Sequence, residues 1–329
     1  MSGLPAGVRE KERLARHTSL KVGGPADYFA EARTIDELTA LLRWADESGI
    51  PRRVIGGGSN LLVADAGVEG LVVKVASSWS EVAERNGQPV LVADAGVTLA
   101  NVARKVSKQG FGGLEWAANV PGSVGGAAVN NAGAFGSDTA SRVISVTMVD
   151  ARGTNQRLEP ADLHFGYRTS VLKRRELGDV AVMRVELRLD HSTPEASQAL
   201  VALYQAQRTA SQPRQLSAGS VFANPEGRFS GQLIEQAGLK GASVGGAQIS
   251  TRHANFIVNL GGATATDVFR LMRCAQDVVF ERSSIWLQSE IELLGRWSDE
   301  EREALFGPVT RPAFRVPRAQ ESATLPRRL

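Results

Sequence analysis

Two glycine-rich stretches about sixty residues apart carry the clearest chemical signal in this chain. The first reads GGGSNLLVADAG from Gly56 to Gly67, and the second reads PGSVGGAAVNNAGAFG from Pro121 to Gly136. Glycine lets the backbone adopt positive φ and bring bare N–H groups against an anion, so each stretch has the residue types that cradle phosphate without a lysine. Glycine clusters also form tight turns between strands, and either stretch by itself favours that interpretation. Because there are two, each after an apolar run, the sequence favours one diphosphate ligand held by both.

Neither stretch matches the common nucleotide-binding fingerprints. No G-x-G-x-x-G opens a helix after a strand, and no G-x-x-x-x-G-K-[ST] occurs in the sequence. These absences argue against a Rossmann dehydrogenase and against a P-loop ATPase.

Length and composition are those of an ordinary globular protein of two or three domains. The 329 residues are 43% hydrophobic and 22% charged, and the formal net charge is +3. Much of the basic excess lies in the last twenty residues, so we do not expect a clustered basic face for nucleic acid. The N-terminal segment is charged and has no apolar signal region, and no run of about 18 apolar residues follows. We therefore expect a cytoplasmic protein without a membrane partner.

Cysteine and histidine usage leaves little room for disulfide or metal chemistry. Cys274 is the single cysteine, and the chain has four histidines. We therefore expect neither an internal disulfide nor a structural zinc site.

Alternating helical and strand patterns are expected to position the two glycine-rich stretches. Thr34 and Glu37 form a capping box in front of an amphipathic helix that ends near Gly49. Further helices are predicted over 98–106, 195–211, 230–237 and 266–283, and strands over 53–55, 70–75, 90–93, 144–150, 156–158, 180–189, 246–250, 254–260 and 286–294. After about residue 298 the chain turns polar and proline-bearing, which predicts a peripheral tail.

Seven motifs, taken in order, resemble those of the UDP-N-acetylenolpyruvoylglucosamine reductases. They are RHTSLKVGGPADYF from Arg16, GGGSNLLV from Gly56, PGSVGGAAVNNAGAFG from Pro121, FGYRTSVLK from Phe165, SAGSVFANP from Ser217, HANFIVN from His253 and WLQSEIELLG from Trp286. The resemblance covers nearly all of residues 14–295. It implies a flavoenzyme of peptidoglycan precursor synthesis with non-covalent FAD. NADPH would reduce the flavin, which then delivers a hydride to UDP-N-acetylglucosamine enolpyruvate, giving UDP-N-acetylmuramate.

The resemblance also implies a fold class and domain limits. We expect an α+β protein with an FAD-binding fold of the vanillyl-alcohol-oxidase type in two subdomains, residues 1–75 and 76–190. A smaller α+β substrate-binding domain, residues 191–297, and a C-terminal tail, residues 298–329, would follow. The glycine loops match the segments that hold the FAD diphosphate and approach the isoalloxazine. The FAD-binding residues implied are Gly56, Gly57, Gly58, Ser59, Asn60, Leu61, Pro121, Gly122, Ser123, Gly125, Gly126, Asn131, Ala132 and Gly133.

The chemistry of the implied substrate sets three demands on the site. Hydride addition to the terminal carbon of an enolpyruvyl group leaves negative charge that delocalises into the carboxylate, and the adjacent carbon must then gain a proton. The site needs a cation for the carboxylate, a group that stabilises the enediolate, and a proton donor. The resemblance places these roles on Arg168, Glu290 and Ser220. A guanidinium meets a planar carboxylate through two hydrogen bonds, and apolar neighbours of Glu290 would oppose its ionisation.

Without the resemblance, each of these residues has a simpler interpretation. Arg168 would form a surface ion pair, the SAGS segment would be an ordinary turn, and Glu290 would face solvent from a strand. His253 is expected to be structural or flavin-adjacent. Substrate contacts are expected from Tyr167, Asn224 and Lys240, the last as a point charge for the UDP diphosphate.

Some features distinguish this chain within the family. One subclass carries an inserted loop with a substrate-clamping tyrosine between the arginine and serine motifs. Here the single tyrosine of that interval, Tyr204, falls inside the predicted helix 195–211, so we expect the subclass without the insertion. Ala118-Asn119-Val120 stands where the family usually has a Gly-Ile pair before the proline, and Ala223 replaces a frequent lysine.

Two other functions fit the glycine loops. A flavin oxidase or dehydrogenase of the same fold would act on another substrate, and such proteins often tether FAD through His or Cys. Cys274, however, lies in a predicted helix far along the sequence from the loops. A non-catalytic nucleotide-binding protein would have kept the loops and lost the chemistry. The joint presence of Arg168, Ser220 and Glu290 argues against it.

Overall fold

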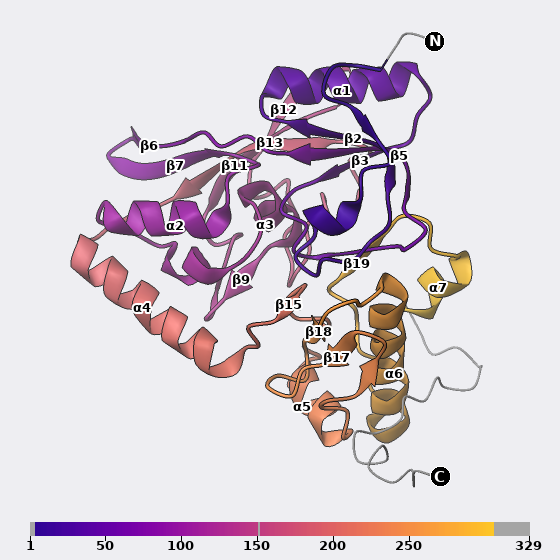
Figure 1. Cartoon of the computed structure of the whole chain (residues 1–329). Helices are drawn as coiled ribbons and strands as arrows, with labels where there is room; N and C mark the ends of the chain where they lie inside the picture. The colour runs from indigo at the N-terminus through magenta and orange to yellow at the C-terminus, as the bar shows by residue number, and fades with distance from the viewer. Residues whose placement is uncertain (1–3, 151, 306–329) are drawn as a thin grey trace, which may run out of the picture. The chain divides into compact units, whose positions relative to one another are not determined.

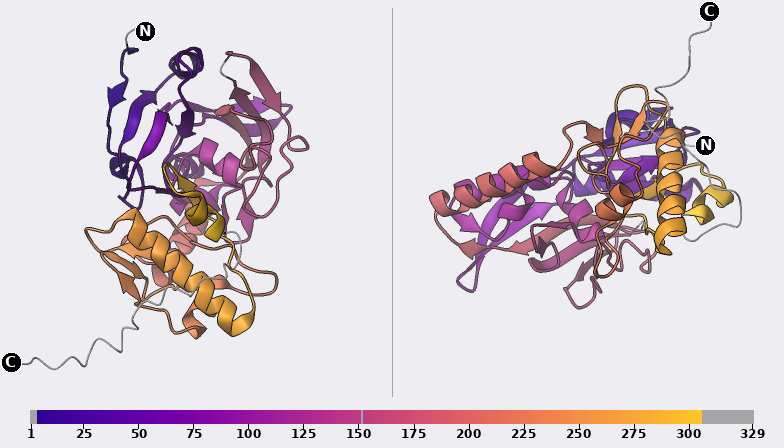
Figure 2. Two further views of the ribbon diagram at one scale, coloured as in Figure 1. Left: turned by 90° about the vertical axis from the view of Figure 1, so that its right-hand side faces the viewer. Right: turned by 90° about the horizontal axis from the view of Figure 1, so that it is seen from below.

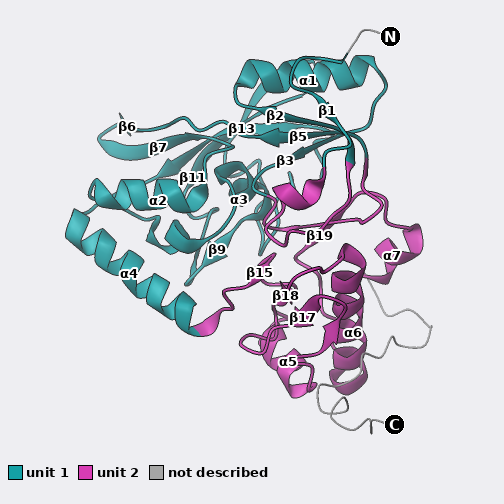
Figure 3. Ribbon diagram, viewed as in Figure 1, with its two compact units in different colours: residues 1–12, 26–57, 69–210 teal, residues 13–25, 58–68, 211–329 magenta. Residues whose placement is uncertain are grey.

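The computed structural model describes residues 4–150 and 152–305. Within these ranges the chain forms two compact units that are interleaved along the sequence (Figure 3). Unit 1 holds the described residues of Met1–Glu12, Ala26–Gly57 and Glu69–Ala210, and unit 2 holds those of Arg13–Pro25, Gly58–Val68 and Ser211–Leu329. Figure 1 labels the helices and strands of both units.

Unit 1 is built on two β-sheets. The first has the strand order β1-β2-β5-β3, formed by Arg9–Glu10, Ala26–Ala32, Val68–Val75 and Arg52–Ile55. The second is antiparallel with the order β12-β11-β13-β7-β6, formed by Asn155–Leu158, Val143–Val149, Ala181–Arg188, Gln88–Asp94 and Ser80–Arg85. Two short pairs join β9 (Gly133–Ala134) to β10 (Ser137–Asp138) and β8 (Phe111–Gly112) to β14 (Asp190–His191).

Four α-helices and one short 3₁₀ helix accompany these sheets in the described part of unit 1. They are α1 (Ile35–Glu47), α2 (Leu99–Lys108), α3 (Val124–Asn130), α4 (Pro194–Ser211, whose last residue belongs to unit 2) and the short 3₁₀ helix η2 (Glu115–Asn119). The predicted cap of α1 is confirmed, because the Thr34 hydroxyl accepts a hydrogen bond from the Glu37 N–H at 3.1 Å. One continuous core joins α1, α2 and α3 to both sheets.

Unit 2 has a smaller sheet and its own core. Its strand order is β15-β18-β17-β16, formed by Leu216–Ser217, Ile257–Asn259, Ala247–Ile249 and Ser243–Val244. A parallel pair joins β4 (Leu61–Val63) to β19 (Glu292–Leu294). The helices are η1 (Leu14–His17), α5 (Ser230–Gln236), α6 (Ala265–Ser283) and α7 (Asp299–Ala304). The long α6 packs along this sheet (Figure 2) and buries Val268, Leu271, Met272, Ala275 and Val279.

The described ranges contain neither a membrane-spanning helix nor a metal-binding cluster. No helix in them combines the length and apolarity needed to cross a membrane. No group of three or more histidine, cysteine or carboxylate side chains in these ranges is arranged to hold a metal ion. The thiol of Cys274 is buried in α6.

The composition of the second glycine-rich stretch suggests a continuous loop. The structure differs, because this stretch contains α3. The hydroxyl of Ser123 accepts a hydrogen bond from the Gly126 N–H at 3.2 Å and so caps this helix. The helix ends at Asn131, which adopts the left-handed conformation with φ of 44°. Two consecutive glycines conceal the helix at the sequence level, since glycine has low helix propensity.

The predicted strand 286–294 is wrong in extent, since the structure retains only β19 at its end. Its first part pairs briefly with another segment, because the Ala223 N–H donates to the Gln288 carbonyl and the Glu290 N–H donates to the Val221 carbonyl, each at 2.9 Å. The chain then changes partner and aligns with β4. Because of this change of partner, the continuous apolar pattern does not form one continuous strand.

The segment that follows residue 298 begins with a helix rather than an irregular tail. Ser298 and Glu301 form a capping box, with each side chain accepting from the other residue's N–H at 3.1 and 2.9 Å. The helix packs on α6, since Leu305 is buried and its carbonyl accepts hydrogen bonds from Gln276 and Trp286. The rest of the predicted tail, residues 306–329, lies outside the described residues.

Candidate active site

The two glycine-rich stretches meet in unit 1. A Cβ atom on Gly57 would lie 2.9 Å from the Cα of Gly122, and one on Gly56 would collide with the hydroxyl of Ser123. Since a side chain cannot approach a neighbouring backbone this closely, the contact requires glycine at Gly57. Segments about sixty residues apart in the sequence thus lie backbone to backbone.

The two glycines at the start of α3 differ in their surroundings. Gly125 packs closely against Ala95, the residue after β7, because a Cβ on Gly125 would lie 2.6 Å from the Cβ of Ala95. On Gly126 the same atom would meet only the Ser123 hydroxyl, at 3.4 Å. Gly125 therefore serves packing, whereas the chain leaves space beside Gly126.

We expect Gly125→Ala and Gly126→Ala to change the stability of the apoprotein in opposite directions. The first should destabilise it by roughly 1–3 kcal/mol, because the added methyl overpacks the contact with Ala95. The second should stabilise it by roughly 0.5–1 kcal/mol, because alanine is the better helix former. Thermal melting of both apoproteins against the parent measures this. Equal melting temperatures for the two variants would contradict it.

A cofactor with a diphosphate fits the residues around this contact. The indole nitrogen of Trp116 and the side-chain amide nitrogen of Asn119 are buried, and neither has a hydrogen-bond partner among the described residues. Both residues belong to η2, which ends directly before Val120 and Pro121. Buried donors beside a glycine-lined backbone are what an acceptor-rich ligand would satisfy.

The first glycine-rich stretch continues into unit 2, where it has two roles. The amide of Asn60 donates to the carbonyl of Glu290 at 2.9 Å, and the Glu292 N–H donates to the Asn60 carbonyl at 3.0 Å. Further on, the carboxylate of Asp65 accepts from the N–H groups of Ala265 and Thr266 at 2.8 and 2.9 Å. The end of the stretch thus caps α6, and its Asn60 holds the segment that carries Glu290.

Ser220 and Glu290 lie on neighbouring segments of unit 2. Val221, which follows Ser220, accepts the hydrogen bond from the Glu290 N–H. Both side chains are half-buried, and the Ser220 hydroxyl forms no hydrogen bond with any other residue that the structure describes. Gly219 precedes Ser220 with φ of 78°, a conformation that glycine adopts without strain. Two of the three predicted catalytic residues are therefore adjacent in the fold.

Sequence reasoning missed Asn255, which fixes the segment after Ser220. Its side chain accepts from the Phe222 N–H at 2.9 Å and donates to the Phe222 carbonyl at 2.8 Å. Its own carbonyl accepts from the Val221 N–H at 2.9 Å. Asn255 is 4% exposed and Phe222 is 1% exposed, so these bonds are made away from water. The sequence signal is an asparagine beside the apolar run Phe256–Val258 of the HANFIVN motif.

We expect Asn255→Leu to lower the free energy of unfolding by roughly 2–5 kcal/mol. The change leaves the buried N–H and carbonyl of Phe222 without partners, and each such group costs about 1–3 kcal/mol. Denaturant and thermal unfolding measure the loss. Asn155→Leu, at an exposed position on β12, is the matched control and should change stability by less than about 1 kcal/mol. If both variants unfold like the parent, Asn255 has no such structural role.

Arg168 belongs to unit 1, where it lies against the second glycine-rich stretch. Its guanidinium donates to the carbonyls of Asn131 and Gly133 at 3.2 and 2.7 Å. The same group lies over the ring of Tyr167, 5.1 Å from the ring centre, and Tyr167 is 59% exposed. Three residues predicted separately, Arg168, Asn131 and Gly133, are therefore in direct contact.

The remaining predicted residues of unit 2 have local partners. Asn224 is exposed and its side chain accepts from the Ser230 N–H at 3.1 Å. Lys240 forms an ion pair of 2.7 Å with Glu235. Burial, with the charge of Lys240 as a smaller cause, lowers the pKa of His253 below its ordinary value, so the imidazole is neutral near pH 7.

Two family models match this chain. Residues 26–159 match the FAD binding domain, and residues 212–294 match the C-terminal domain of UDP-N-acetylenolpyruvoylglucosamine reductase. The chain is also 43% identical over 293 residues to UDP-N-acetylenolpyruvoylglucosamine reductase 2 of Symbiobacterium thermophilum, covering 88% of this chain and 93% of that protein. This chain belongs to the UDP-N-acetylenolpyruvoylglucosamine reductase family.

Other members of the reductase family are similarly close. The reductase of Anoxybacillus flavithermus is 41% identical over 291 residues, covering 88% of this chain and 95% of that protein. The crystal structure of the reductase from Thermus caldophilus aligns with a TM-score of 0.74 and 36% identity, covering 87% of this chain and 99% of that one. The predicted α+β fold, an FAD-binding domain followed by a smaller C-terminal domain, is thereby confirmed.

Proposed function

We propose that this chain catalyses the NADPH-dependent reduction of UDP-N-acetylglucosamine enolpyruvate to UDP-N-acetylmuramate, with FAD as its cofactor. The observation that carries this function is an identity of 41–43% to curated reductases over nearly the whole length of both chains. The matched FAD binding domain spans both glycine loops as far as residue 159, and the matched C-terminal domain contains Ser220 and Glu290. The activity belongs to peptidoglycan precursor synthesis.

FAD is proposed to bind where the glycine loops meet. Gly57 and Gly122 let the two backbones touch, and the buried nitrogens of Trp116 and Asn119, which have no hydrogen-bond partner among the described residues, lie shortly before Pro121 in the chain. The proposed cofactor residues are those predicted from the resemblance: Gly56, Gly57, Gly58, Ser59, Asn60, Leu61, Pro121, Gly122, Ser123, Gly125, Gly126, Asn131, Ala132 and Gly133. Bound FAD would supply the hydride-transfer chemistry between NADPH and the enolpyruvyl group.

Three side chains of this protein are proposed to manage charge and protons on the substrate. Arg168 binds the substrate carboxylate, which holds the enolpyruvyl group and stabilises the charge that develops on it. Ser220 gives its hydroxyl proton to the carbon next to the carboxylate. Glu290 donates a hydrogen bond to the enediolate or restores the proton of Ser220. The hydrogen bond from Glu290 to the residue after Ser220 supports a joint action of these two.

Substrate contacts are proposed for Tyr167, Asn224 and Lys240. The exposure of Tyr167 and Asn224 supports this role, since each ring or amide is accessible to a ligand. Lys240 is paired with Glu235, so a diphosphate would have to compete with or join that ion pair.

We place this chain in the subclass without the tyrosine insertion. The interval between Arg168 and Ser220 is occupied by β13, β14, α4 and β15, so regular elements fill most of it. Tyr204 lies in α4 and stacks on Phe135, with ring centres 4.4 Å apart and planes at 12°. Residues other than an inserted tyrosine would then clamp the uridine.

The predicted domain limits are retained as a proposal about function. The first sheet falls within residues 9–75 and the second within 80–188, which supports two FAD-binding subdomains, 1–75 and 76–190. The substrate domain, 191–297, is proposed from the motifs it carries, although unit 2 also includes residues 13–25 and 58–68. A cytoplasmic location, with small molecules as the partners, likewise stays a prediction.

The purified full chain tests the proposed function directly. Its visible spectrum should show flavin that acid releases into the supernatant, and NADPH should be consumed in proportion to the enolpyruvyl nucleotide added, with UDP-N-acetylmuramate as product. A flavoprotein that leaves this nucleotide unchanged would instead be another oxidoreductase of the same fold. A colourless protein that takes up no FAD would contradict the proposed function.

A further inference from the structure

The backbone at Arg168 is held in an uncommon conformation. Its φ is 57°, in the left-handed region that a residue with a side chain rarely adopts. A tight turn imposes this, because Gly166 and Thr169 exchange two hydrogen bonds, at 3.0 and 3.2 Å, across Tyr167 and Arg168. The ammonium of Lys173 donates to the Arg168 carbonyl at 3.1 Å. Such conformations persist only where the surroundings enforce them, often at functional sites.

The guanidinium of Arg168 is oriented by two backbone carbonyls. These belong to Asn131 and Gly133, at the end of α3 and the start of β9. Two bonds from different nitrogens fix the plane of the group, and they use two of its five donors. The direction in which Arg168 presents its charge therefore depends on where residues 131–133 lie.

The Asn131 side chain joins the turn of Arg168 to those carbonyls. It is 3% exposed, and its amide donates to the Gly166 carbonyl at 2.9 Å and to the Asp138 carboxylate at 3.2 Å. Its oxygen accepts from the Ala140 N–H at 2.9 Å. Both amide hydrogens are thus used within the protein, so a contact of Asn131 with the cofactor would come from its main chain.

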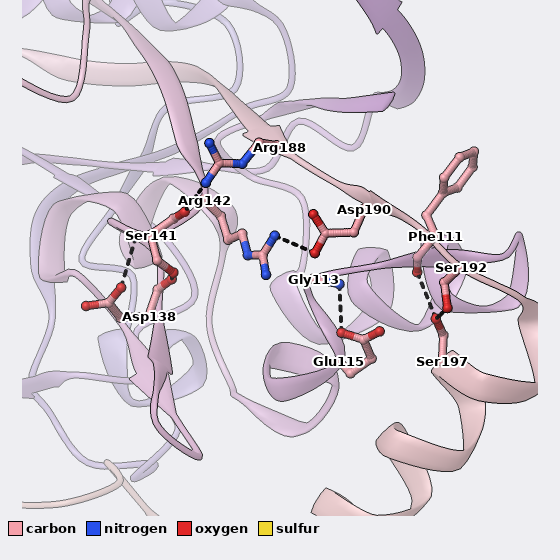
Figure 4. A network of polar contacts seen from close by, with 10 residues as sticks. All are labelled: Phe111, Gly113, Glu115, Asp138, Ser141, Arg142, Arg188, Asp190, Ser192 and Ser197. Atoms are coloured by element: carbon pink, nitrogen blue, oxygen red, sulfur yellow. Dashed lines mark hydrogen bonds and ion pairs between the residues drawn. The ribbon is translucent and has the colours of Figure 1, made fainter. Parts of the chain in front are cut away.

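Asp138 connects this side chain to the second sheet. Its other carboxylate oxygen accepts from the Ser141 N–H at 3.0 Å, and the Ser141 carbonyl accepts from Arg188 on β13 at 2.9 Å (Figure 4). The next residue, Arg142, forms an ion pair of 2.7 Å with Asp190 on β14 (Figure 4). A continuous series of hydrogen bonds therefore runs from a sheet strand through Ser141, Asp138 and Asn131 to Arg168.

We propose that Asp138 and Asn131 are positioning residues for Arg168, which set the orientation of its guanidinium toward the substrate carboxylate. The inference rests on the proposed function of Arg168. Neither residue touches the substrate in this role. Asp138 fixes the Asn131 amide, and Asn131 fixes both the turn and the carbonyl that orient the guanidinium. Loss of Asp138 therefore weakens recognition of the carboxylate and leaves recognition of the rest of the nucleotide unchanged.

The test compares two ligands that differ at the group Arg168 is proposed to bind. Calorimetric titration of the FAD-loaded protein with UDP-N-acetylmuramate, which has the carboxylate, and with UDP-N-acetylglucosamine, which lacks it, measures the difference. We expect Asp138→Ala to weaken the affinity for UDP-N-acetylmuramate by about tenfold, which corresponds to the loss of roughly one hydrogen bond. The affinity for UDP-N-acetylglucosamine should fall by less than about twofold. Asp138→Asn, which keeps the size of the side chain, should also lower the affinity for UDP-N-acetylmuramate, but by a smaller factor.

A double-mutant cycle separates positioning from a general structural effect. In the Arg168→Ala background, Asp138→Ala should cause no further loss for UDP-N-acetylmuramate, since the group that it positions is gone. Asp150→Ala is the matched control. The Asp150 carboxylate accepts hydrogen bonds from the N–H groups of Arg152 and Thr154 at 2.9 and 2.8 Å, as that of Asp138 accepts from Ser141, and this variant should change neither affinity. Melting temperatures and FAD content are measured for every variant.

Each outcome decides between the proposals. The positioning role is overturned if Asp138→Ala and Asp138→Asn lower the affinities for both ligands equally. It is also overturned if these changes lower the affinity for UDP-N-acetylmuramate further in the Arg168→Ala background. If Arg168→Ala loses the preference for the carboxylate while both Asp138 variants retain it, the positioning role fails and the role of Arg168 stands. If the parent protein binds neither ligand, the proposed function itself fails. Should Asp138→Ala not fold, the milder Asp138→Asn gives the same comparison.

Discussion

Ser220→Ala is expected to slow reoxidation of the reduced flavin by the enolpyruvyl nucleotide by about 10²–10⁴-fold, while reduction of the flavin by NADPH keeps nearly the parent rate. The second half-reaction needs a proton at the carbon next to the carboxylate, and the first does not. The Ser220 hydroxyl is half-buried and forms no hydrogen bond with another described residue, so its removal costs little stability. Stopped-flow absorbance of the flavin measures each half-reaction separately.

Ser217→Ala is the matched control for this prediction. Ser217 lies three residues earlier in the same motif, at the end of β15, where its backbone pairs with Val258. Both half-reactions of this variant should proceed within about threefold of the parent. If Ser220→Ala instead slowed reduction by NADPH and left reoxidation intact, Ser220 would act in the nicotinamide step and the proton-donor role would have to be abandoned.

Arg168→Ala is expected to lower kcat/KM for the enolpyruvyl nucleotide by about 10²–10³-fold, or roughly 3–4 kcal/mol. The variant removes the cation that meets the substrate carboxylate and the charge that develops on it. NADPH should still reduce the flavin at nearly the parent rate. Steady-state kinetics over a range of nucleotide concentrations, together with stopped-flow reduction, gives both quantities.

Arg168→Lys isolates the contribution of the guanidinium geometry. It keeps the positive charge but loses the planar fork that binds a carboxylate through two hydrogen bonds. It also loses the paired bonds to the Asn131 and Gly133 carbonyls. We expect activity between those of the parent and of Arg168→Ala. A KM and a reoxidation rate that are unchanged in Arg168→Ala would rule out carboxylate binding by this residue.

Periodicity predicted most long elements of the fold correctly. The predicted helices 195–211 and 266–283 agree with α4 and α6 to within a residue at each end, because long amphipathic patterns and caps are local signals. The helix α3 was missed, since its glycines disfavour a helix unless neighbouring backbone holds them. The prediction of one strand over 286–294 was wrong in extent. The apolar pattern continues through this segment, but its pairing partner changes from residues 221–223 to β4.

The candidate site shows the same division at the level of single residues. Motif order marked Arg168, Ser220 and Glu290, and the structure places Ser220 and Glu290 on adjacent segments of unit 2. Asn255 and Asp138 were not predicted, although Asn255 holds the segment after Ser220 and Asp138 holds the Asn131 amide that bonds the turn of Arg168. Their functions depend on which polar groups the fold brings within hydrogen-bond distance of an amide or carboxylate, and no residue type or spacing encodes that.

The sequence by itself determined the family, the cofactor and the three residues proposed for the chemistry. These follow from side-chain types in an ordered set of motifs, and such types are visible without coordinates. Only the tertiary structure decided that Asn60 bonds the carbonyl of Glu290, 230 positions away, and that Asn131 bonds the turn of Arg168. The physical reason is that these contacts join side-chain donors to main-chain carbonyls. Every residue has such a carbonyl, so its position, which the folded chain alone sets, decides whether the bond forms.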